Sequence, residues 1–144
     1  MAHEEDLPNT VAMLGQAYSL LGFKIVDGVV GAGYPQKPKH SAVFAQIRPE
    51  GSRVVDLARG ANMTPQAMGE LVDELVELGY VVRKRDPADG RAKLVTLTAR
   101  GQASVRAGMA TIQGIEEQLD ALLGREGRAT LRRLLAMILS VDPD

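Results

Sequence analysis

The chain has 144 residues, of which 24% are charged, and a formal net charge of −1; this is the balance of one soluble globular domain with its own core. It has no cysteine, which excludes a disulfide framework, a thiol switch and a thiolate metal site. The near-neutral charge argues against nucleic acid binding over the whole surface, but not against a local basic patch. The acidic start MAHEEDLP does not have the pattern of a signal peptide, and no apolar run reaches the length of a membrane span. We therefore expect a cytoplasmic protein without a membrane partner.

The N-terminal region is predicted to be a loosely held lead over residues 1–8, followed by a first helix from Asn9 or Thr10 to about Gly31. The apolar residues of this helix recur at spacings of three and four and form one face. They are Val11, Leu14, Tyr18, Leu21, Ile25 and Val29. Glycines inside the helix weaken it in isolation by roughly 1 kcal/mol each relative to alanine, so it needs packing partners.

Three shorter helices are predicted after a loop with two prolines. The first two, His40 to Ile47 and Arg53 to Arg59, are separated by the break RPEGS. The third has the clearest signals, because Thr64 can cap it, Pro65 takes its first position and Gly79 closes it. Its apolar residues fall at i, i+3, i+4, i+7 and i+8: Met68, Leu71, Val72, Leu75 and Val76. Residues 54–79 therefore have the pattern of a helix–turn–helix.

The stretch YVVRKRDPADGRAKLVTLTARG is predicted to form two strands joined by a tight turn, followed at once by a helix start. Tyr80 to Arg85 and Ala92 to Leu97 alternate as strands do, with Tyr80 and Val82 on one face. In the DPADG segment between them, proline fixes φ and glycine permits a positive φ. The hairpin gathers the basic residues Arg83, Lys84, Arg85, Arg91 and Lys93. Contact with a polyanion and protection of an exposed sheet edge by charge are both open interpretations.

Two helices are predicted after the hairpin, from Ala99 to about Leu123 and from Arg128 to about Ser140, with Gly124 ending the first. Together with the first helix they carry more apolar surface than a small domain can cover. They either pack on the central domain or form a dimer interface, and we favour the interface. The predicted fold is mainly α with a small β-hairpin, in a single domain over residues 1–144. A winged helix-turn-helix lobe at 40–98 is flanked by dimerisation helices at 9–31 and 99–140.

Two stretches of sequence carry a resemblance to a known family. DPADGRAKLVTLTARG resembles the wing signature of the MarR (multiple antibiotic resistance regulator) family of bacterial transcription factors. LVDELVELGYVVRKRD is similar to the end of that family's recognition helix and its first wing strand. The strong match covers residues 54–101, and the flanking helices agree in length and order. The resemblance implies a homodimer in the cytoplasm, at the nucleoid, that binds a roughly palindromic operator in double-stranded DNA, usually as a ligand-responsive repressor.

DNA contacts are expected from the first turns of the helix at Pro65 and from the wing. Gln66 has the amide that pairs with adenine, and Thr64 can bond a base or a phosphate. The resemblance implies that Arg91 enters the minor groove, with Asp89 as its orienting carboxylate. The predicted DNA-binding residues are Thr64, Pro65, Gln66, Ala67, Gly69, Glu70, Lys84, Arg85, Asp89, Arg91 and Lys93. Gly69 and Glu70 depart from the basic or hydroxyl residues of many relatives, so Glu70 either accepts from a cytosine or bonds within the protein.

The resemblance also implies a site for a small aromatic or phenolic effector between the dimerisation helices and the DNA-binding lobe. Candidate lining residues are Tyr18, Phe23, His40 and Phe44, and core packing is the alternative role of each. With no cysteine and two histidines far apart in the sequence, we expect no enzyme activity, no metal and no cofactor. The alternative function is a winged helix that binds proteins, or one that binds DNA architecturally without choosing a sequence.

Overall fold

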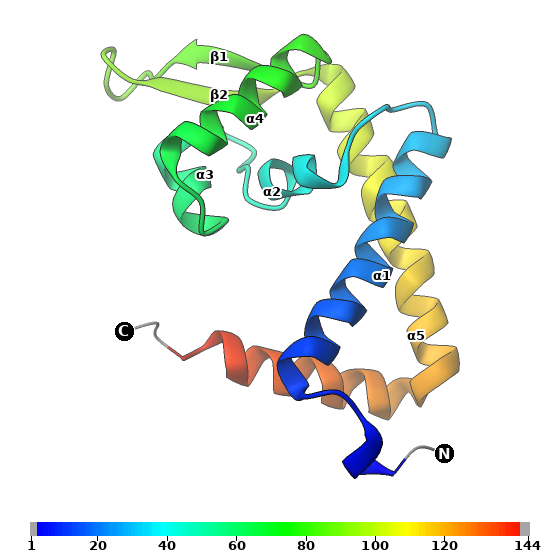
Figure 1. Cartoon of the computed structure of the whole chain (residues 1–144). Coiled ribbons are helices and arrows are strands. Elements are labelled where there is room, and N and C mark those ends of the chain that lie inside the picture. The colour runs from blue at the N-terminus through cyan, green and yellow to red at the C-terminus, as the bar shows by residue number, and fades with distance from the viewer. Residues whose placement is uncertain (1–2, 142–144) are drawn as a thin grey trace.

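The computed structural model describes residues 3–141 and divides them into a winged lobe and a pair of long helices (Figure 1). Helix α1 (Thr10–Gly31) and the first part of helix α5 (Ala99–Leu139) pack against each other, and the lobe lies at one end of this pair. The Asn9 side chain caps α1 by accepting from the backbone amide of Ala12 at 2.9 Å. The predicted loose lead contains a short 3-10 turn, η1 (Glu4–Asp6), and residues 1 and 2 lie outside the described residues.

The lobe contains the predicted helix–turn–helix and hairpin in the predicted order. Its elements are η2 (Pro38–His40), α2 (Ser41–Phe44), α3 (Val54–Gly60), α4 (Pro65–Glu77), β1 (Val81–Arg85) and β2 (Lys93–Leu97). The predicted helix from His40 to Ile47 is wrong in extent, because it divides into η2 and the single turn of α2. Beyond Ile47 the chain cannot continue as a helix, because Pro49 keeps Arg48 out of the helical region and Gly51 takes a positive φ of 102°.

The core of the lobe lies between α4, the start of β1 and the short helices. Its buried residues are Val43, Leu57, Ala58, Met68, Leu71, Val72, Leu75, Tyr80, Val81 and Val95. Four of the five apolar residues predicted for α4 are among them, but Val76 is 38% exposed, so the apolar stripe is narrower than predicted. The Tyr80 hydroxyl donates to the carbonyl oxygen of Pro35 at 2.6 Å, which satisfies its one polar group inside the lobe.

The wing is an antiparallel hairpin in the register Val81↔Leu97 to Arg85↔Lys93. The predicted alternation in β1 is wrong, because Tyr80 and Val81 are both buried while residues 83–85 are exposed. After its first residue the strand leaves the core, so neither face of its outer half has anything to pack against. A third segment joins the sheet unpredicted: Ser52 and Val95 exchange two backbone hydrogen bonds of 3.0 and 2.8 Å.

Helix α5 changes direction at Gly124, whose φ of 77° and ψ of 159° are not helical (Figure 1). The predicted break at this glycine is confirmed, but helix resumes directly after it and not at Arg128. Arg128 holds the bend, since its Nε lies 2.6 Å from Asp120 and its Nη1 lies 2.7 Å from Glu116. Among residues 3–141, none of the helices has both the length and the apolar character needed to cross a membrane.

Both long helices expose apolar side chains. On α1 these include Val11, Leu14, Tyr18, Leu20 and Phe23; on α5 they include Leu122, Leu131, Leu134, Met137, Ile138 and Leu139. Packing within the chain buries only a few residues of the α1–α5 pair, notably Val26, Val29 and Ile115. The interpretation that these helices are covered by the central domain is therefore wrong for most of this surface.

Two glycines of α5 give a test of how closely the lobe packs on that helix. A Cβ at Gly101 would overlap the carbonyl oxygen of Tyr80, whereas a Cβ at Gly114 would meet nothing within 4 Å. Gly101→Ala is therefore expected to lower the free energy of unfolding by at least about 1–3 kcal/mol, because backbone atoms must move. Gly114→Ala is expected to raise it by roughly 0.5–1 kcal/mol through helix propensity. Urea unfolding of both variants measures this, and a harmless Gly101→Ala would contradict the packing.

Candidate nucleic-acid interface

The first turn of α4 points out of the lobe and ends in exposed polar groups. Thr64 caps the helix, since its Oγ1 accepts from the backbone amide of Ala67 at 3.1 Å, and Pro65 occupies the first helical position as predicted. Gln66 and Glu70 are exposed, while Ala67 and Gly69 are half-buried between them. The narrow apolar stripe on the opposite side holds this face outward. The backbone amides of the first turn add a partial positive charge to it.

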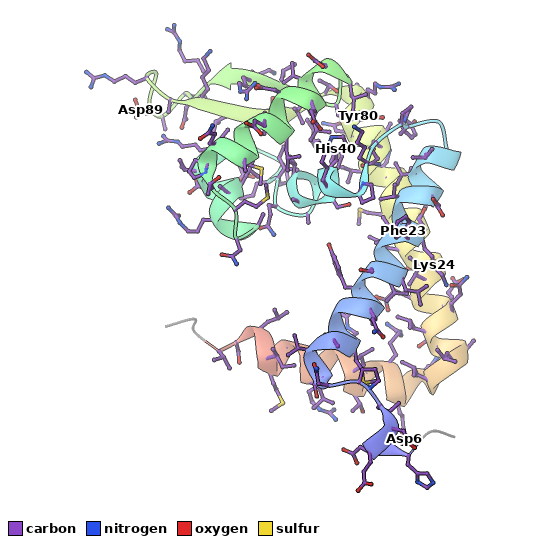
Figure 2. All side chains as sticks on the ribbon, in the orientation of Figure 1. Asp6, Phe23, Lys24, His40, Tyr80 and Asp89 are labelled. Carbon is purple, nitrogen blue, oxygen red and sulfur yellow. The ribbon has the colours of Figure 1, made fainter. Side chains whose placement is uncertain are left out.

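The wing projects beside α4 and carries exposed basic side chains toward its tip. Lys84, Arg85, Arg91 and Lys93 are exposed, and within residues 3–141 no carboxylate forms an ion pair with any of them. Asp89 lies at the tip (Figure 2). Its role differs from the predicted one: Oδ1 accepts from the backbone amide of Arg91 at 3.1 Å. Asp89 therefore fixes the turn that presents Arg91, and does not orient the guanidinium directly.

The second half of α4 is less acidic in effect than its sequence indicates. Arg83, predicted as part of the basic hairpin, turns back to Asp73, with 2.7 Å between Nη1 and Oδ1. Glu74 is bound by Lys39 at 2.8 Å and by His40 at 2.7 Å. Two of the three carboxylates in this half, including both that lie nearest the exposed first turn, are thus neutralised by ion pairs.

His40 has a structural role and does not line the effector hollow that was predicted for it. Its side chain is only 2% exposed and lies inside the lobe near Tyr80 (Figure 2). Nδ1 accepts from the backbone amide of Lys37 at 3.0 Å, and Nε2 bonds Glu74. Both ring nitrogens are therefore occupied, and the ring ties η2 to α4.

Glu74 joins η2 to α4, and its titration gives a test of that contact. The hydrogen bonds from Lys39 and His40 lower the pKa of Glu74 from 4.5 to about 2. A depressed carboxyl pKa stabilises the folded state above pH 4.5, and this contribution is lost as the pH falls from 4.5 toward 2. The melting temperature of the wild type should therefore fall more steeply between pH 5 and 3 than that of Glu74→Gln. Glu77→Gln, on the same helix, is the control and should follow the wild type; equal slopes for wild type and Glu74→Gln would contradict the assignment.

Two of the four predicted effector residues lie together. Tyr18 lines a hollow of about 390 Å³ between α1 and the lobe, with Pro38, Lys39, Ser41 and Ala42 among its walls. Tyr18 and Phe23 also line an adjoining hollow of about 130 Å³. Phe44 does not join them, because its ring packs edge-on against Tyr80 with centroids 5.9 Å apart.

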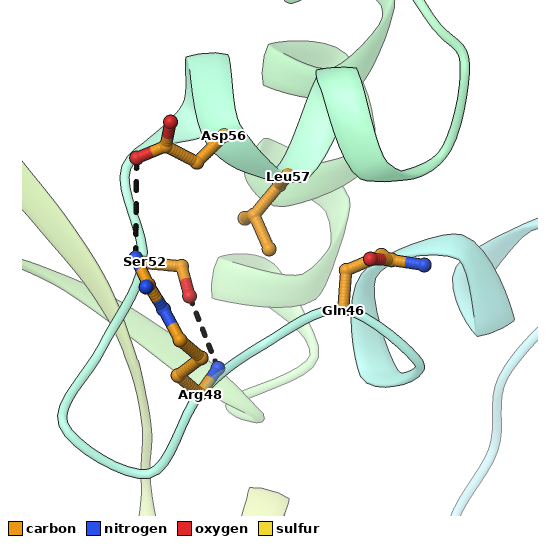
Figure 3. A pocket seen from close by; sticks show the side chains of 5 residues that line it. All are labelled: Gln46, Arg48, Ser52, Asp56 and Leu57. Carbon is orange, nitrogen blue, oxygen red and sulfur yellow. Dashed lines mark hydrogen bonds and ion pairs between the residues drawn. The ribbon is translucent and has the colours of Figure 1, made fainter. Parts of the chain in front are cut away.

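A third hollow, of about 340 Å³, lies beside the α2–α3 loop and was not predicted (Figure 3). It is lined by Gln46, Arg48, Ser52, Asp56 and Leu57. The backbone amide of Arg48 donates to Ser52 Oγ at 3.0 Å, and its guanidinium reaches Asp56 at 4.0 Å. These contacts lie within the α2–α3 loop and the start of α3, and they fix the shape of that loop. No spacing in the sequence indicates them, because they depend on the backbone conformation of this loop.

Sequence reasoning also missed a contact between α3 and the wing. Arg53, which precedes α3, reaches Asp86 at the end of β1, although 33 residues separate them in the sequence.

Within residues 3–141, no three His, Cys, Asp or Glu side chains are gathered as metal ligands would be.

A helix–turn–helix with an outward first turn, beside a basic two-stranded wing, defines a winged helix protein. Over residues 37–92 the chain matches the model of the MarR family. It is 33% identical over 85 residues to the HTH-type transcriptional repressor Rv2887 of Mycobacterium tuberculosis, covering 59% of this chain. The matched stretch spans only 61% of the length of that repressor.

Solved structures resemble the chain over more of its length. A probable transcriptional regulator from Pseudomonas aeruginosa has a TM-score of 0.74 and 28% identity, covering 94% of this chain and 99% of that one. The repressor CouR bound to a 23-mer DNA duplex has a TM-score of 0.68 and 25% identity, over 88% and 92%. Rv2887 in complex with salicylic acid has a TM-score of 0.67 and 25% identity, over 93% and 98%. These comparisons agree with the winged helix fold along both long helices and the lobe.

Proposed function

We propose that the chain is a DNA-binding regulator of transcription, and not an enzyme, which acts in the cytoplasm at the nucleoid. In this proposal it is a homodimer that binds a roughly palindromic operator and represses transcription. One observation carries the proposal: the exposed first turn of α4 and the exposed basic wing belong to the same lobe, side by side. The similarity to CouR, which is a repressor bound to DNA, supports it.

The two parts of this surface have different tasks in the proposal. The first turn of α4 enters the major groove, where the Gln66 amide pairs with adenine and Glu70 is able to accept from a cytosine amino group. Thr64 uses its oxygen as a cap and keeps its hydroxyl hydrogen for a phosphate or a base. Arg91 enters the minor groove, whose negative potential attracts a guanidinium. Lys84, Arg85 and Lys93 bind phosphate and set the register.

The dimer supplies the second half-site. The exposed apolar residues of α1 and of α5 after Gly124 are too many for a monomer in water, so a second copy is the proposed cover. A two-fold symmetric pair presents two α4 helices, and adjacent major grooves on one side of B-DNA lie about 34 Å apart. A palindromic operator follows from this symmetry.

Selection of bound sequences from a random DNA library tests the proposal directly. We expect an inverted repeat whose half-sites are about 10 base pairs apart, centre to centre. Affinity for it should fall about a thousandfold between 50 and 200 mM salt if roughly six phosphates or more are neutralised. Salt-dependent binding without a preferred sequence would indicate an architectural module, and absence of DNA binding would indicate a protein-binding module.

The proposed regulator responds to a small aromatic or phenolic acid in the hollow beside Tyr18. The similarity to Rv2887, solved in complex with salicylic acid, supports this, and so does the presence of Tyr18 in the wall of the hollow. Salicylic acid should raise the melting temperature and release the operator. Tyr18→Ala should lose both effects, whereas Gln16→Ala, a change at an exposed polar residue of the same helix, should keep them. A response of equal size in both variants would remove the hollow from this role.

A further inference from the structure

The ion pair of Arg53 and Asp86 connects the start of α3 to the wing. Arg53 Nε and Nη2 lie 3.1 and 2.7 Å from Asp86 Oδ2. The other carboxylate oxygen, Oδ1, accepts from the backbone amide of Ala88 at 2.9 Å. Asp86 is only 7% exposed, in a hairpin whose neighbouring residues are almost all exposed. Both of its oxygens are therefore used, one by the helix–turn–helix and one by the turn of the wing.

Asp86 is also the residue on which that turn is built. Its backbone amide donates to Ala92 at 2.9 Å, and its carbonyl oxygen accepts from Asp89 at 3.2 Å. Asp89 in turn fixes the backbone amide of Arg91. A continuous series of bonds thus leads from Arg53 through Asp86 and Asp89 to Arg91.

Apart from the bonds of Arg83 to α4, which act near the base of the wing, few contacts define the direction of the wing. A two-stranded ribbon is at best marginally stable alone, and the outer half of this one has no core to pack against. Ser52 fixes the middle of β2 through its backbone bonds to Val95, and the next residue, Arg53, holds the end of β1. Residues 52 and 53 therefore hold the hairpin at two separate points. Two fixed points define the angle between the wing and α4, whereas a single fixed point would leave the wing free to turn.

Electrostatics keeps the pair charged under ordinary conditions. The guanidinium of Arg53, together with the backbone amide of Ala88, lowers the pKa of Asp86 below the usual value for a carboxyl group. Asp86 therefore stays ionised at neutral pH, and its hydrogen bonds are of the stronger, charge-assisted kind.

We infer that Arg53 and Asp86 are positioning residues that hold the wing at the angle from which Arg91 reaches the DNA. This inference rests on the proposed DNA-binding function. We call this ion pair of Arg53 and Asp86 the strut. The strut itself makes no contact with DNA. It acts by ordering the turn before binding, so less conformational freedom is lost when Arg91 enters the groove.

The inference has a specific competitor, because the partly exposed Arg53 could instead bind a phosphate directly. Asp86→Asn separates the two roles. The substitution weakens the strut, and it also removes a negative charge near DNA. The loss of charge by itself should leave operator binding unchanged or tighter. Asp56→Asn is the matched control, since Asp56 lies on α3, pairs with Arg59 and makes the same change in charge.

We expect Asp86→Asn and Arg53→Met each to weaken binding to the selected operator by roughly tenfold, and the double variant to be no weaker than either alone. Arg53→Lys should be intermediate, and Asp56→Asn should bind at least as well as the wild type. In the Asp86→Asn background, Arg91→Ala should cost less than it does in the wild type. Binding by Asp86→Asn equal to that of Asp56→Asn would overturn the strut. So would a loss confined to Arg53→Met with a salt slope reduced by about one, the mark of a phosphate contact.

Amide hydrogen exchange without DNA gives a readout that does not depend on operator binding. In Asp86→Asn and Arg53→Met the amides of residues 88–92 should exchange at least several-fold faster, while the core amide of Tyr80 keeps its wild-type rate. Unchanged exchange at residues 88–92 would refute the strut, as would equal acceleration of the core amide in both variants. A wild type that selects no operator would instead remove the proposed function, and the exchange rates would still decide whether the wing is held by this pair.

Discussion

Ending the chain after Gly124 is expected to convert the dimer to a monomer and to reduce operator affinity by about three orders of magnitude or more. The truncation removes the exposed apolar residues Leu131, Leu134, Met137, Ile138 and Leu139, which nothing among residues 3–141 covers. A single lobe then keeps one half-site and loses the gain from binding two linked sites. Light scattering measures the first effect, and gel shift with the selected operator measures the second.

Point variants separate the apolar surface from the length of the chain. Leu134→Glu combined with Ile138→Glu places two negative charges on the proposed interface, and Arg133→Glu makes the same change of two in net charge beside it. Only the double variant should become monomeric, with the circular dichroism spectrum of the lobe retained. A stable dimer of the double variant, or of the truncated chain, would show that the interface lies elsewhere.

Arg91→Ala is expected to weaken operator binding by on the order of 1–3 kcal/mol and to leave the free energy of unfolding unchanged. Its guanidinium forms no ion pair within residues 3–141, so its removal breaks nothing inside the described chain. The loss should be largest for operators with a narrow A·T-rich minor groove at the wing position. Arg106→Ala is the control, because Arg106 is an exposed arginine on α5 and the charge change is the same. Equal losses in the two variants would make the effect one of general charge.

Local signals predicted the elements of the lobe well. The cap at Thr64, the proline after it and the apolar spacing of α4 act within a few residues of one another, so a helix of the right extent follows from them. The turn residues of the wing act just as locally. Gly124 was predicted as a break for the same reason, since its positive φ is a property of one residue.

The errors and omissions concern partners that are distant in the sequence. Val76 fits the apolar period of α4 but meets no partner, and the alternation in β1 fails where the strand leaves the core. Neither the bond between Arg53 and Asp86 nor the pairing of Ser52 with Val95 has a local signature. They arise only when α3 and the wing are brought together, so no pattern within either segment indicates them.

The candidate site divides in the same way. The exposure of Gln66 and Glu70 followed from the apolar face of α4 opposite them, because burial of one side turns the other outward. Asp89 was predicted to orient the guanidinium of Arg91, but it accepts a hydrogen bond from the backbone amide of that residue. His40 was predicted to line the effector site, but it has a structural role inside the lobe. In both cases the residue was rightly singled out, but its hydrogen-bond partner depends on backbone geometry that the sequence does not contain.

The backbone at Gly124 sets the outline of the whole molecule. Its φ and ψ lie in a region that residues with a Cβ avoid, although a Cβ there would meet no atom within 4 Å. Alanine at this position would therefore be unfavourable because of its backbone torsion angles and not because of crowding. Helical torsion angles here would make α5 a straight rod of 41 residues, about 60 Å long. The apolar part of α5 after Gly124 would then point along that rod and away from the N-terminal half of α1. The backbone conformation of this single residue thus decides whether α5 is bent or straight, and so which shape a second copy must fit.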